Sequence, residues 1–453
     1  MTAGESLRAL VPALAAVGLA ASPGMAQQTL TLEDALRAAL ARNPGIESAT
    51  AAAAAAKSSR WADWGVFLPT ARVGATLFSS DFTNVTFVTP EGSSGTIDPP
   101  LKDTRKSSNA NLALGLTILN PERISEVKAG GARQGAAELR LTLAERTVIR
   151  DVKRAYFEAL KQQQLVSVAE RQLESRRQDR SVTEGRYRIA AASRSDLLGS
   201  EIDVGDAELR LLDARDAQSR ALRSLQVLLA EPATAARPEE ITLVDMDLVP
   251  DAAALDADRL ADAAQAANPG LQALRYDEKA AAASLLSRRF AYLPTIDIGL
   301  LFGRGKEVAR DESLFDFSPA NTSTTFTISG SWNLFSGFSR KRQTAEADLR
   351  LRQVRADLTA QELLIGKEVR DLVNELNRRS VRLQLLERNV QLASERLELA
   401  RQQYRLGGIP YFNLQQAIDR LQQTEQLLFQ ERYDYLIGWA NLEEKVGGDL
   451  GGG

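Results

Sequence analysis

The sequence predicts a mixed fold of membrane β-strands and very long coiled-coil helices, in which one structural unit is built twice. Three observations predict it. Short motifs recur at a nearly constant spacing along the 453 residues. Stretches of about ten residues alternate between apolar and small polar side chains, as membrane β-strands do. Helical patterns continue without a break for about 70 residues, whereas an average helix has about 11–12.

Composition excludes most catalytic chemistry. The chain contains no cysteine and no histidine, which removes thiol nucleophiles, disulfides, Ser-His-Asp triads and the usual zinc ligands. The net charge of −3 gives no basic footprint for nucleic acid. No paired acids stand out in a pocket-like context. We therefore expect no enzymatic activity, no cofactor, no metal site and no nucleic-acid partner.

The N-terminus has the pattern of an export signal. An uncharged run that includes ALVPALAAVGLAA is followed by the small residues Gly24 and Ala26, which permit cleavage after residue 26. A short membrane anchor is the alternative, and the proline and glycine inside the apolar stretch favour the signal. No other uninterrupted apolar run reaches about 18 residues, so we expect no transmembrane helix.

The chain is internally duplicated. The tripeptide Asn-Pro-Gly at 43–45 recurs 225 residues later at 268–270, and the element FLPT recurs as YLPT with the same spacing. Farther along, the spacing shortens to 217 residues, which relates Tyr187 to Tyr404. The change in spacing falls in the Ser-, Gly- and Pro-rich stretch 79–107. We expect this stretch to be an exposed loop, because length differences belong in loops.

The duplication divides the chain into segments. Each repeat contains a short Ala-rich helix, two strands and a long helical hairpin, and the glycine-rich C-terminus is typical of a flexible tail. The predicted boundaries are a signal peptide at 1–26, a first repeat at 27–230, a linker at 231–258, a second repeat at 259–447 and a tail at 448–453.

Four stretches alternate with a period of two: ARVGATLF, LALGLTIL, TIDIGLLF and TFTISGSWNLF. This pattern is typical of membrane barrel strands, but it also fits a half-buried sheet in a soluble domain, and the strands alone leave both readings open. In a membrane, one face would contact lipid and the other the lumen. The residues expected to face lipid are Leu112, Leu114, Leu116, Ile296, Ile298, Phe326, Ile328 and Trp332.

The helices favour the membrane reading. Each long pattern, at 121–190 and 337–406, would form a rod of roughly 100 Å at about 1.5 Å per residue. No globular domain of this size buries such a rod, so the helices must pack along one another as coiled coils. The helix that follows repeats an apolar position every seven residues, at Leu414, Leu421, Leu428, Tyr435 and Leu442. We expect its aromatic side chains Tyr433, Tyr435 and Trp439 to be packing residues.

The predicted strands and helices can form a complete membrane structure only if several chains assemble. Four strands cannot close a barrel, because the smallest membrane barrels have eight, and an open sheet in lipid leaves backbone groups unpaired. The chain must therefore share a barrel with other copies, and the helices would continue that barrel as a hollow bundle. The sequence YRLGGIP at 404–410 breaks a strong helical pattern with two glycines and a proline. We expect this turn at the far end of the bundle.

The duplicated layout, the NPG and LPT elements and the stretch YRLGGIPYFNLQQAIDRLQQTEQLLFQERYDYLIGWANLEEKVG resemble the TolC-type outer-membrane efflux family. The resemblance extends from about Leu30 to Val446. It implies a homotrimer, with 3 × 4 = 12 strands in one outer-membrane β-barrel continued by a periplasmic α-helical tunnel.

By function, the resemblance implies a passive exit duct in a Gram-negative outer membrane, for multidrug efflux or type I secretion. The implied partners are outer-membrane lipid, a periplasmic adaptor (membrane fusion) protein and an inner-membrane pump of the resistance-nodulation-division or ABC type. The alternative is a periplasmic coiled-coil adaptor or scaffold, but adaptors have one hairpin and no duplicated strand pairs.

The resemblance also assigns a gate to the hairpin turns. Two acids that line the tunnel mouth in relatives align with the neutral residues Asn413 and Gln416, and the basic latch residue aligns with Ile409. Tyr404 and Asp196 match the family pattern and would form a hydrogen-bonded latch. The residues expected to dock an adaptor are Arg188, Ala190, Ala191, Arg405, Gly407, Gly408 and Pro410.

Overall fold

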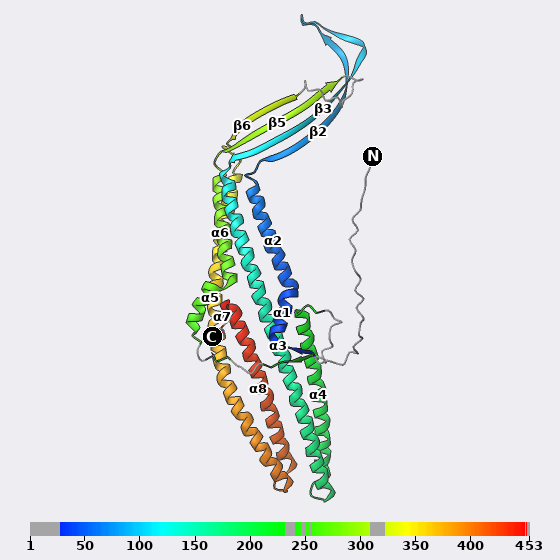
Figure 1. The fold of residues 1–453 in the computed structure, drawn as a ribbon, viewed down its shortest axis with the longest axis vertical. Helices are drawn as coiled ribbons and strands as arrows, with labels where there is room; N and C mark the ends of the chain where they lie inside the picture. Colours follow the sequence, from blue (N-terminus) through cyan, green and yellow to red (C-terminus); the bar gives the residue numbers. More distant parts are fainter. Residues whose placement is uncertain are drawn as a thin grey trace, which may run out of the picture.

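Two very long helices connect a four-stranded sheet at one end of the molecule to two helical turns at the other (Figure 1). The computed structural model describes residues 28–231, 241–245, 250–252, 255–308, 322–448 and 450. The predicted signal peptide and most of the predicted tail lie outside these residues, as does part of the linker. No helix of the described residues is both long and apolar enough to cross a bilayer.

The two repeats have the same order of elements. The first contains β1 (Gln28–Leu30), α1 (Leu32–Arg42), α2 (Pro44–Gly65), β2 (Thr70–Val88), β3 (Ser94–Leu119), α3 (Pro121–Arg188) and α4 (Arg194–Leu228). The second contains β4 (Ile241–Leu243), α5 (Ala257–Ala267), α6 (Pro269–Phe290), β5 (Thr295–Val308), β6 (Thr322–Ser331), α7 (Ser339–Arg405) and α8 (Tyr411–Val446).

The repeated Asn-Pro-Gly motif begins the short helices α2 and α6. Asn43 and Asn268 are the N-caps, and their side chains accept hydrogen bonds from the backbone N–H groups of Gly45 and Gly270. Proline then occupies the first helical position, where no N–H is needed. The same asparagines donate to carbonyls at the ends of α4 and α8, Leu228 and Lys445. Each motif therefore joins a short helix to the end of a hairpin.

The barrel strands form one antiparallel sheet in the order β2-β3-β5-β6. Directly paired residues of an antiparallel ladder point to the same face. Leu114 pairs with Leu300, which pairs with Phe326, and the neighbouring row joins Leu116, Ile298 and Ile328. Leu112 and Ile296 lie on this same apolar face by alternation. Trp332 follows the end of β6, where its indole N–H donates to the carbonyl of Tyr292 at 3.0 Å.

The stretch 79–107 is not the loop that its composition predicted. It belongs to β2 and β3, which pair up to a tight turn between Val88 and Ser94. The register shifts between Asn84 and Thr86, and across this shift four residues of β3, 97–100, stand against one residue of β2. Two prolines stand there, where the ladder needs no backbone N–H. The extra length of the first repeat is therefore a longer hairpin, because backbone pairing does not require alternating side chains.

The waist of the molecule contains the largest core cluster of the described residues, which includes Ile241, Leu243 and Ala252 from the segment between the repeats. β1 and β4 pair in parallel beside the long helices. The Tyr156 hydroxyl lies within hydrogen-bond distance of two backbone carbonyls, those of Leu30 at 2.9 Å and Val244 at 2.8 Å, and shares its one hydrogen between them. The Tyr435 hydroxyl donates to the carbonyl of Pro250. Tyr433 and Tyr435 are fully buried and Trp439 nearly so. The prediction that these three are packing residues is confirmed.

Candidate functional site at the hairpin tips

The two hairpin turns have the same backbone geometry. At the end of α7, the N–H of Gly408 donates to the carbonyl of Gln403 at 2.8 Å, and Gly407 adopts a left-handed φ of 81°. At the end of α3, Ala191 donates to Arg186 at 2.8 Å, and Ala190 has a φ of 60°. Both are Schellman motifs, which end a helix with one left-handed residue.

An open groove of about 540 Å³ lies between the two turns. It brings together seven of the residues that the sequence assigned to gating or docking: Ala190, Ala191, Asp196, Tyr404, Gly407, Gly408 and Pro410. Arg188, Arg405, Asn413 and Gln416 do not line this groove and are exposed nearby on the ends of their helices.

The two side chains that the sequence paired as a latch have other partners. The Tyr404 hydroxyl lies 3.1 Å from the hydroxyl of Thr183 on α3, and both residues are buried. The Asp196 carboxylate accepts the backbone N–H of Ser193, and Ser193 in turn accepts from Asp196. This capping box begins α4 and holds the carboxylate at its own turn. The predicted hydrogen bond between Tyr404 and Asp196 is therefore not formed within the chain.

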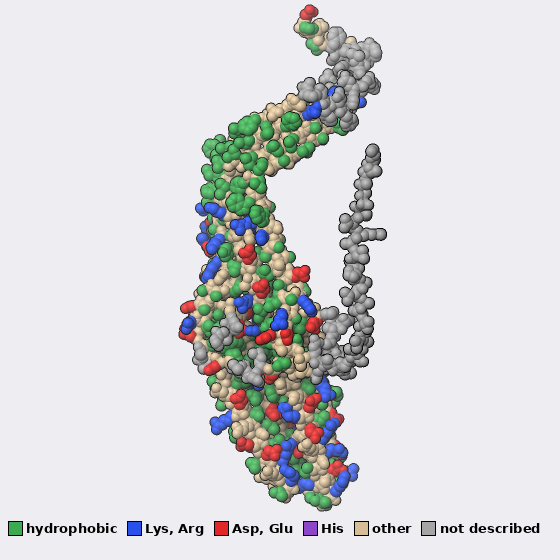
Figure 2. All heavy atoms as spheres, in the orientation of Figure 1, with side chains coloured by type: hydrophobic (Ala, Val, Ile, Leu, Met, Phe, Trp, Pro, Cys, Tyr) green, Lys and Arg blue, Asp and Glu red, His purple; other side chains and the backbone are tan. Residues whose placement is uncertain are grey.

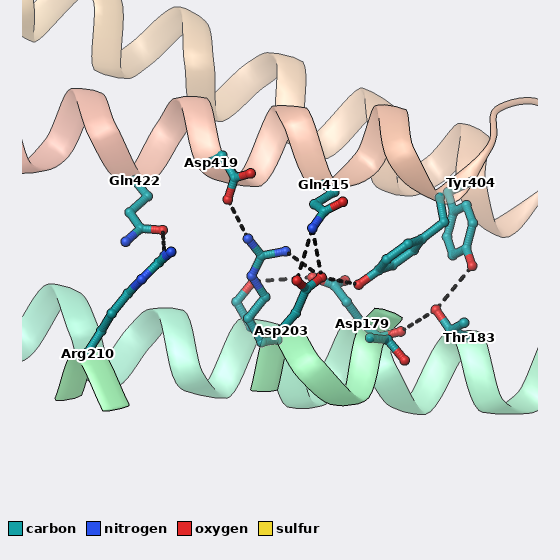
Figure 3. A network of polar contacts seen from close by, with 12 residues as sticks. Asp179, Thr183, Asp203, Arg210, Tyr404, Gln415, Asp419 and Gln422 are labelled. Atoms are coloured by element: carbon teal, nitrogen blue, oxygen red, sulfur yellow. Dashed lines mark hydrogen bonds and ion pairs between the residues drawn. The ribbon is translucent and has the colours of Figure 1, made fainter. Parts of the chain in front are cut away.

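A polar network centred on Asp203 links the two hairpins instead (Figure 3). The Asp203 carboxylate, on α4, accepts hydrogen bonds from the Tyr411 hydroxyl at 2.7 Å and from Gln415 Nε2 at 2.9 Å, both on α8. Arg176 of α3 lies 3.4 Å from Asp203 and donates to Asp419 of α8 at 2.6 Å. Every one of these bonds except that between Arg176 and Asp203 crosses from one hairpin to the other.

Burial strengthens the links to Asp203 more than the link to Asp419, whose side chain is 55% exposed. Arg176 is 6% exposed and Tyr411 is 7% exposed. Burial raises the pKa of the Tyr411 hydroxyl, and the hydrogen bond to the Asp203 carboxylate raises it further. Tyr411 therefore stays a protonated donor throughout the physiological pH range. Hydrogen bonds to a charged group stabilise more than neutral ones, and a buried charge that loses its partner is costly.

A second group of contacts lies between α3 and α7. Arg401 of α7 pairs with Asp179 of α3 at 3.6 Å and donates to Ser175. Burial raises the pKa of the Asp179 carboxyl, against the opposing effects of Arg401 and Arg176. Nearer the turn, the Arg186 guanidinium stacks 4.4 Å above the Tyr404 ring and donates to its carbonyl. These contacts tie α7 to α3 between Ser175 and the turn.

Sequence reasoning missed this network. Its members are ordinary surface residue types for a coiled coil, and nothing in the local sequence pattern distinguishes them. They are Arg176, Asp203, Tyr411, Gln415 and Asp419. One signal was available: each residue lies within about four helical turns of a hairpin turn, in the part of the chain where the two hairpins pack against each other. Which of them meet depends on the rotation of each helix, which the heptad pattern does not give.

Comparison with known proteins agrees with this architecture. The outer membrane efflux protein family matches residues 35–231 and 260–448, which are the two repeats. The alkaline protease secretion protein AprF of Pseudomonas aeruginosa is 24% identical over 338 residues, 75% of this chain and 69% of that protein. Protein CyaE of Bordetella pertussis is 30% identical over 223 residues, 48% of this chain and 43% of that protein.

Solved structures share the fold. The outer membrane channel CmeC of Campylobacter jejuni has a TM-score of 0.80 at 13% identity, with 92% of this chain and 86% of that chain covered. The outer-membrane channel OprN has a TM-score of 0.78 at 18% identity, with 92% and 90% covered. The predicted duplication, the four barrel strands and the long helices are confirmed. The chain belongs to the outer membrane efflux protein family: it is a TolC-type, non-enzymatic outer-membrane channel of an efflux or type I secretion system, with a periplasmic helical extension.

Proposed function

We propose that this chain forms a homotrimeric exit duct whose periplasmic mouth is held shut by the contacts between its two hairpins. Membership of the family implies a trimer that works with an efflux or secretion pump. The observation that carries the proposal is the Asp203 network, which ties α8 to α3 and α4 close to the turns. For the mouth to widen, α7 and α8 would have to move away from α3 and α4, and these bonds would break.

The aperture is proposed to lack an acidic ring. Asn413 and Gln416 are exposed on the first turns of α8, at the positions where relatives carry acids. Three copies of a neutral amide bind a divalent cation more weakly than three carboxylates would, because amide carbonyls are ligands without a charge. Cation selectivity and block by divalent or trivalent cations should therefore be weak.

The outer surfaces of the tips are proposed to dock a periplasmic adaptor protein. Gly407 and Gly408 leave the backbone uncovered, and the groove between the turns is open to a partner. A bulky residue at Gly408 should therefore block export without lowering the amount of trimer. A cysteine at Gly408 should also crosslink to the tip of the adaptor, and the absence of crosslinks from any tip position would move the docking site elsewhere.

For the cargo, we propose a secreted polypeptide, with a pump of the ABC type. The longer of the two relative matches is to a protein named for alkaline protease secretion. The alternative is a small molecule exported by a pump of the resistance-nodulation-division type, as the family description suggests. A host that lacks its own channel can be supplied with this chain and either pump with its adaptor. Protein in the medium supports secretion, and restored drug resistance alone supports efflux.

The channel function itself has a direct biochemical test. A trimer that resists heating in detergent and is found in the outer-membrane fraction supports the proposal. A soluble periplasmic product, or a monomer in every detergent, would support the adaptor or scaffold alternative.

A further inference from the structure

The charge of the hairpin tips is positive at the point where the duct would open. Within residues 185–195 and 399–418 the sequence contains five arginines and no acidic residue: Arg186, Arg188, Arg194, Arg401 and Arg405. Figure 2 shows Lys and Arg side chains interspersed with Asp and Glu over the lower end of the molecule, and hydrophobic residues at the extreme tips.

Two of these five charges are neutralised locally. Arg188 pairs with Glu184 at 2.6 Å, and Arg401 pairs with Asp179 and Glu398. Arg186, Arg194 and Arg405 have no carboxylate partner among the described residues. Asp196 is the one acid beside them, so the tips retain a net charge of 3 − 1 = +2 per chain, or +6 per trimer.

Acids farther up the helices do not cancel this charge. Two helical turns correspond to about 11 Å along the axis, which exceeds the Debye length of about 8 Å at physiological ionic strength. A narrow mouth also focuses the field of the charges that surround it. The neutral side chains of Asn413 and Gln416 add nothing of opposite sign.

We infer that the periplasmic mouth of this duct prefers anions, and that Arg194 and Arg405 set this preference. The inference rests on the proposed function, in which the mouth lies at these tips. If the electrostatic energy of a unit charge at the mouth is about one kT, anions are enriched about e-fold there and cations are depleted about e-fold. The ratio of anion to cation concentration at the mouth is then about seven. Anionic solutes, and acidic segments of a polypeptide, would therefore enter most easily.

The test is the reversal potential of purified trimers in a planar bilayer under a KCl gradient. The unmodified channel should show a Cl⁻ to K⁺ permeability ratio above one. Arg194→Gln with Arg405→Gln removes six positive charges per trimer and should bring the ratio close to one. Arg194→Glu with Arg405→Glu should reverse the preference to K⁺.

Matched controls carry the same charge change far from the mouth. Arg37→Glu on α1 and Arg223→Glu on α4 alter exposed arginines and should leave the reversal potential unchanged. A conducting trimer that prefers K⁺, or one whose selectivity ignores both tip variants, contradicts this inference and leaves the channel function standing. Failure to obtain any conducting trimer contradicts the proposed function and, with it, the inference.

Discussion

Removing one hydroxyl from the Asp203 network should open the channel. Tyr411→Phe keeps the buried ring and deletes only the hydrogen bond of 2.7 Å to the Asp203 carboxylate. Hydrogen bonds to charged groups contribute about 1.5–3 kcal/mol net. Because Asp203 keeps its contacts with Gln415 and Arg176, we take the lower end of this range, about 1.5 kcal/mol per chain, as the stabilisation of the closed hairpins that the variant loses.

That energy is large for a gating equilibrium. A free energy of about 1.4 kcal/mol is a tenfold change in an equilibrium constant. Tyr411→Phe should therefore favour separation of the hairpins about tenfold in each chain, and about a thousandfold if three chains open together. Single-channel recording of purified trimers in a planar bilayer should show a higher open probability and a larger mean conductance.

The chain offers a matched control at its waist. The Tyr433 hydroxyl donates to Asp245 at 2.9 Å, and burial raises the pKa of Tyr433 as it does that of Tyr411. Tyr433→Phe should lower stability to a similar degree and leave conductance unchanged. Asp203→Asn completes a double-mutant cycle with Tyr411→Phe. Equal conductance of the two tyrosine variants, or additive effects of the two network variants, would refute the reasoning.

Three further predictions concern the turn, the barrel and the aperture. Ala190→Gly should stabilise the α3–α4 turn by about 1 kcal/mol, because an alanine in the left-handed region is strained, and hydrogen exchange of the tip amides should slow about fivefold. Leu114→Arg should cost about 2–4 kcal/mol if this face meets lipid at midplane, whereas Ala113→Arg on the opposite face should cost much less; equal yields of heat-resistant trimer would contradict the assignment. Asn413→Asp should shift selectivity toward cations and strengthen divalent block, and strong block in the unmodified channel would show that other acids line the aperture.

Part of the fold could be predicted from the sequence because it depends on local patterns. The long helices α3 and α7 end within two residues of the predicted limits, since a continuous period of 3.6 residues and two turn signals define them. The outer part of β2 and β3 could not be predicted, because backbone pairing there proceeds through a stretch without apolar alternation.

The predicted latch between Tyr404 and Asp196 shows more clearly what could not be predicted from the sequence. Alignment along the sequence correctly brought Tyr404 and Asp196 to one groove, but it could not assign their partners. Asp196 is held by its own helix cap, while the rotation of α7 brings Tyr404 against Thr183. Contacts between hairpins depend on how four helices pack side by side, and single-helix periodicity carries no information about their relative rotation.

The most direct test of the account is a distance between hairpin tips in the assembled trimer. Because the chain has no cysteine, Leu406→Cys provides a single spin-label site, and this residue is 88% exposed at the tip of α7. Three labels related by threefold symmetry give one distance by pulsed electron paramagnetic resonance. A gate held shut by the hairpin network predicts one short, narrow distance in the unmodified channel and a longer, broader one after Tyr411→Phe with Asp203→Asn. An unchanged distance in that variant, in a trimer whose conductance has risen, would contradict the account.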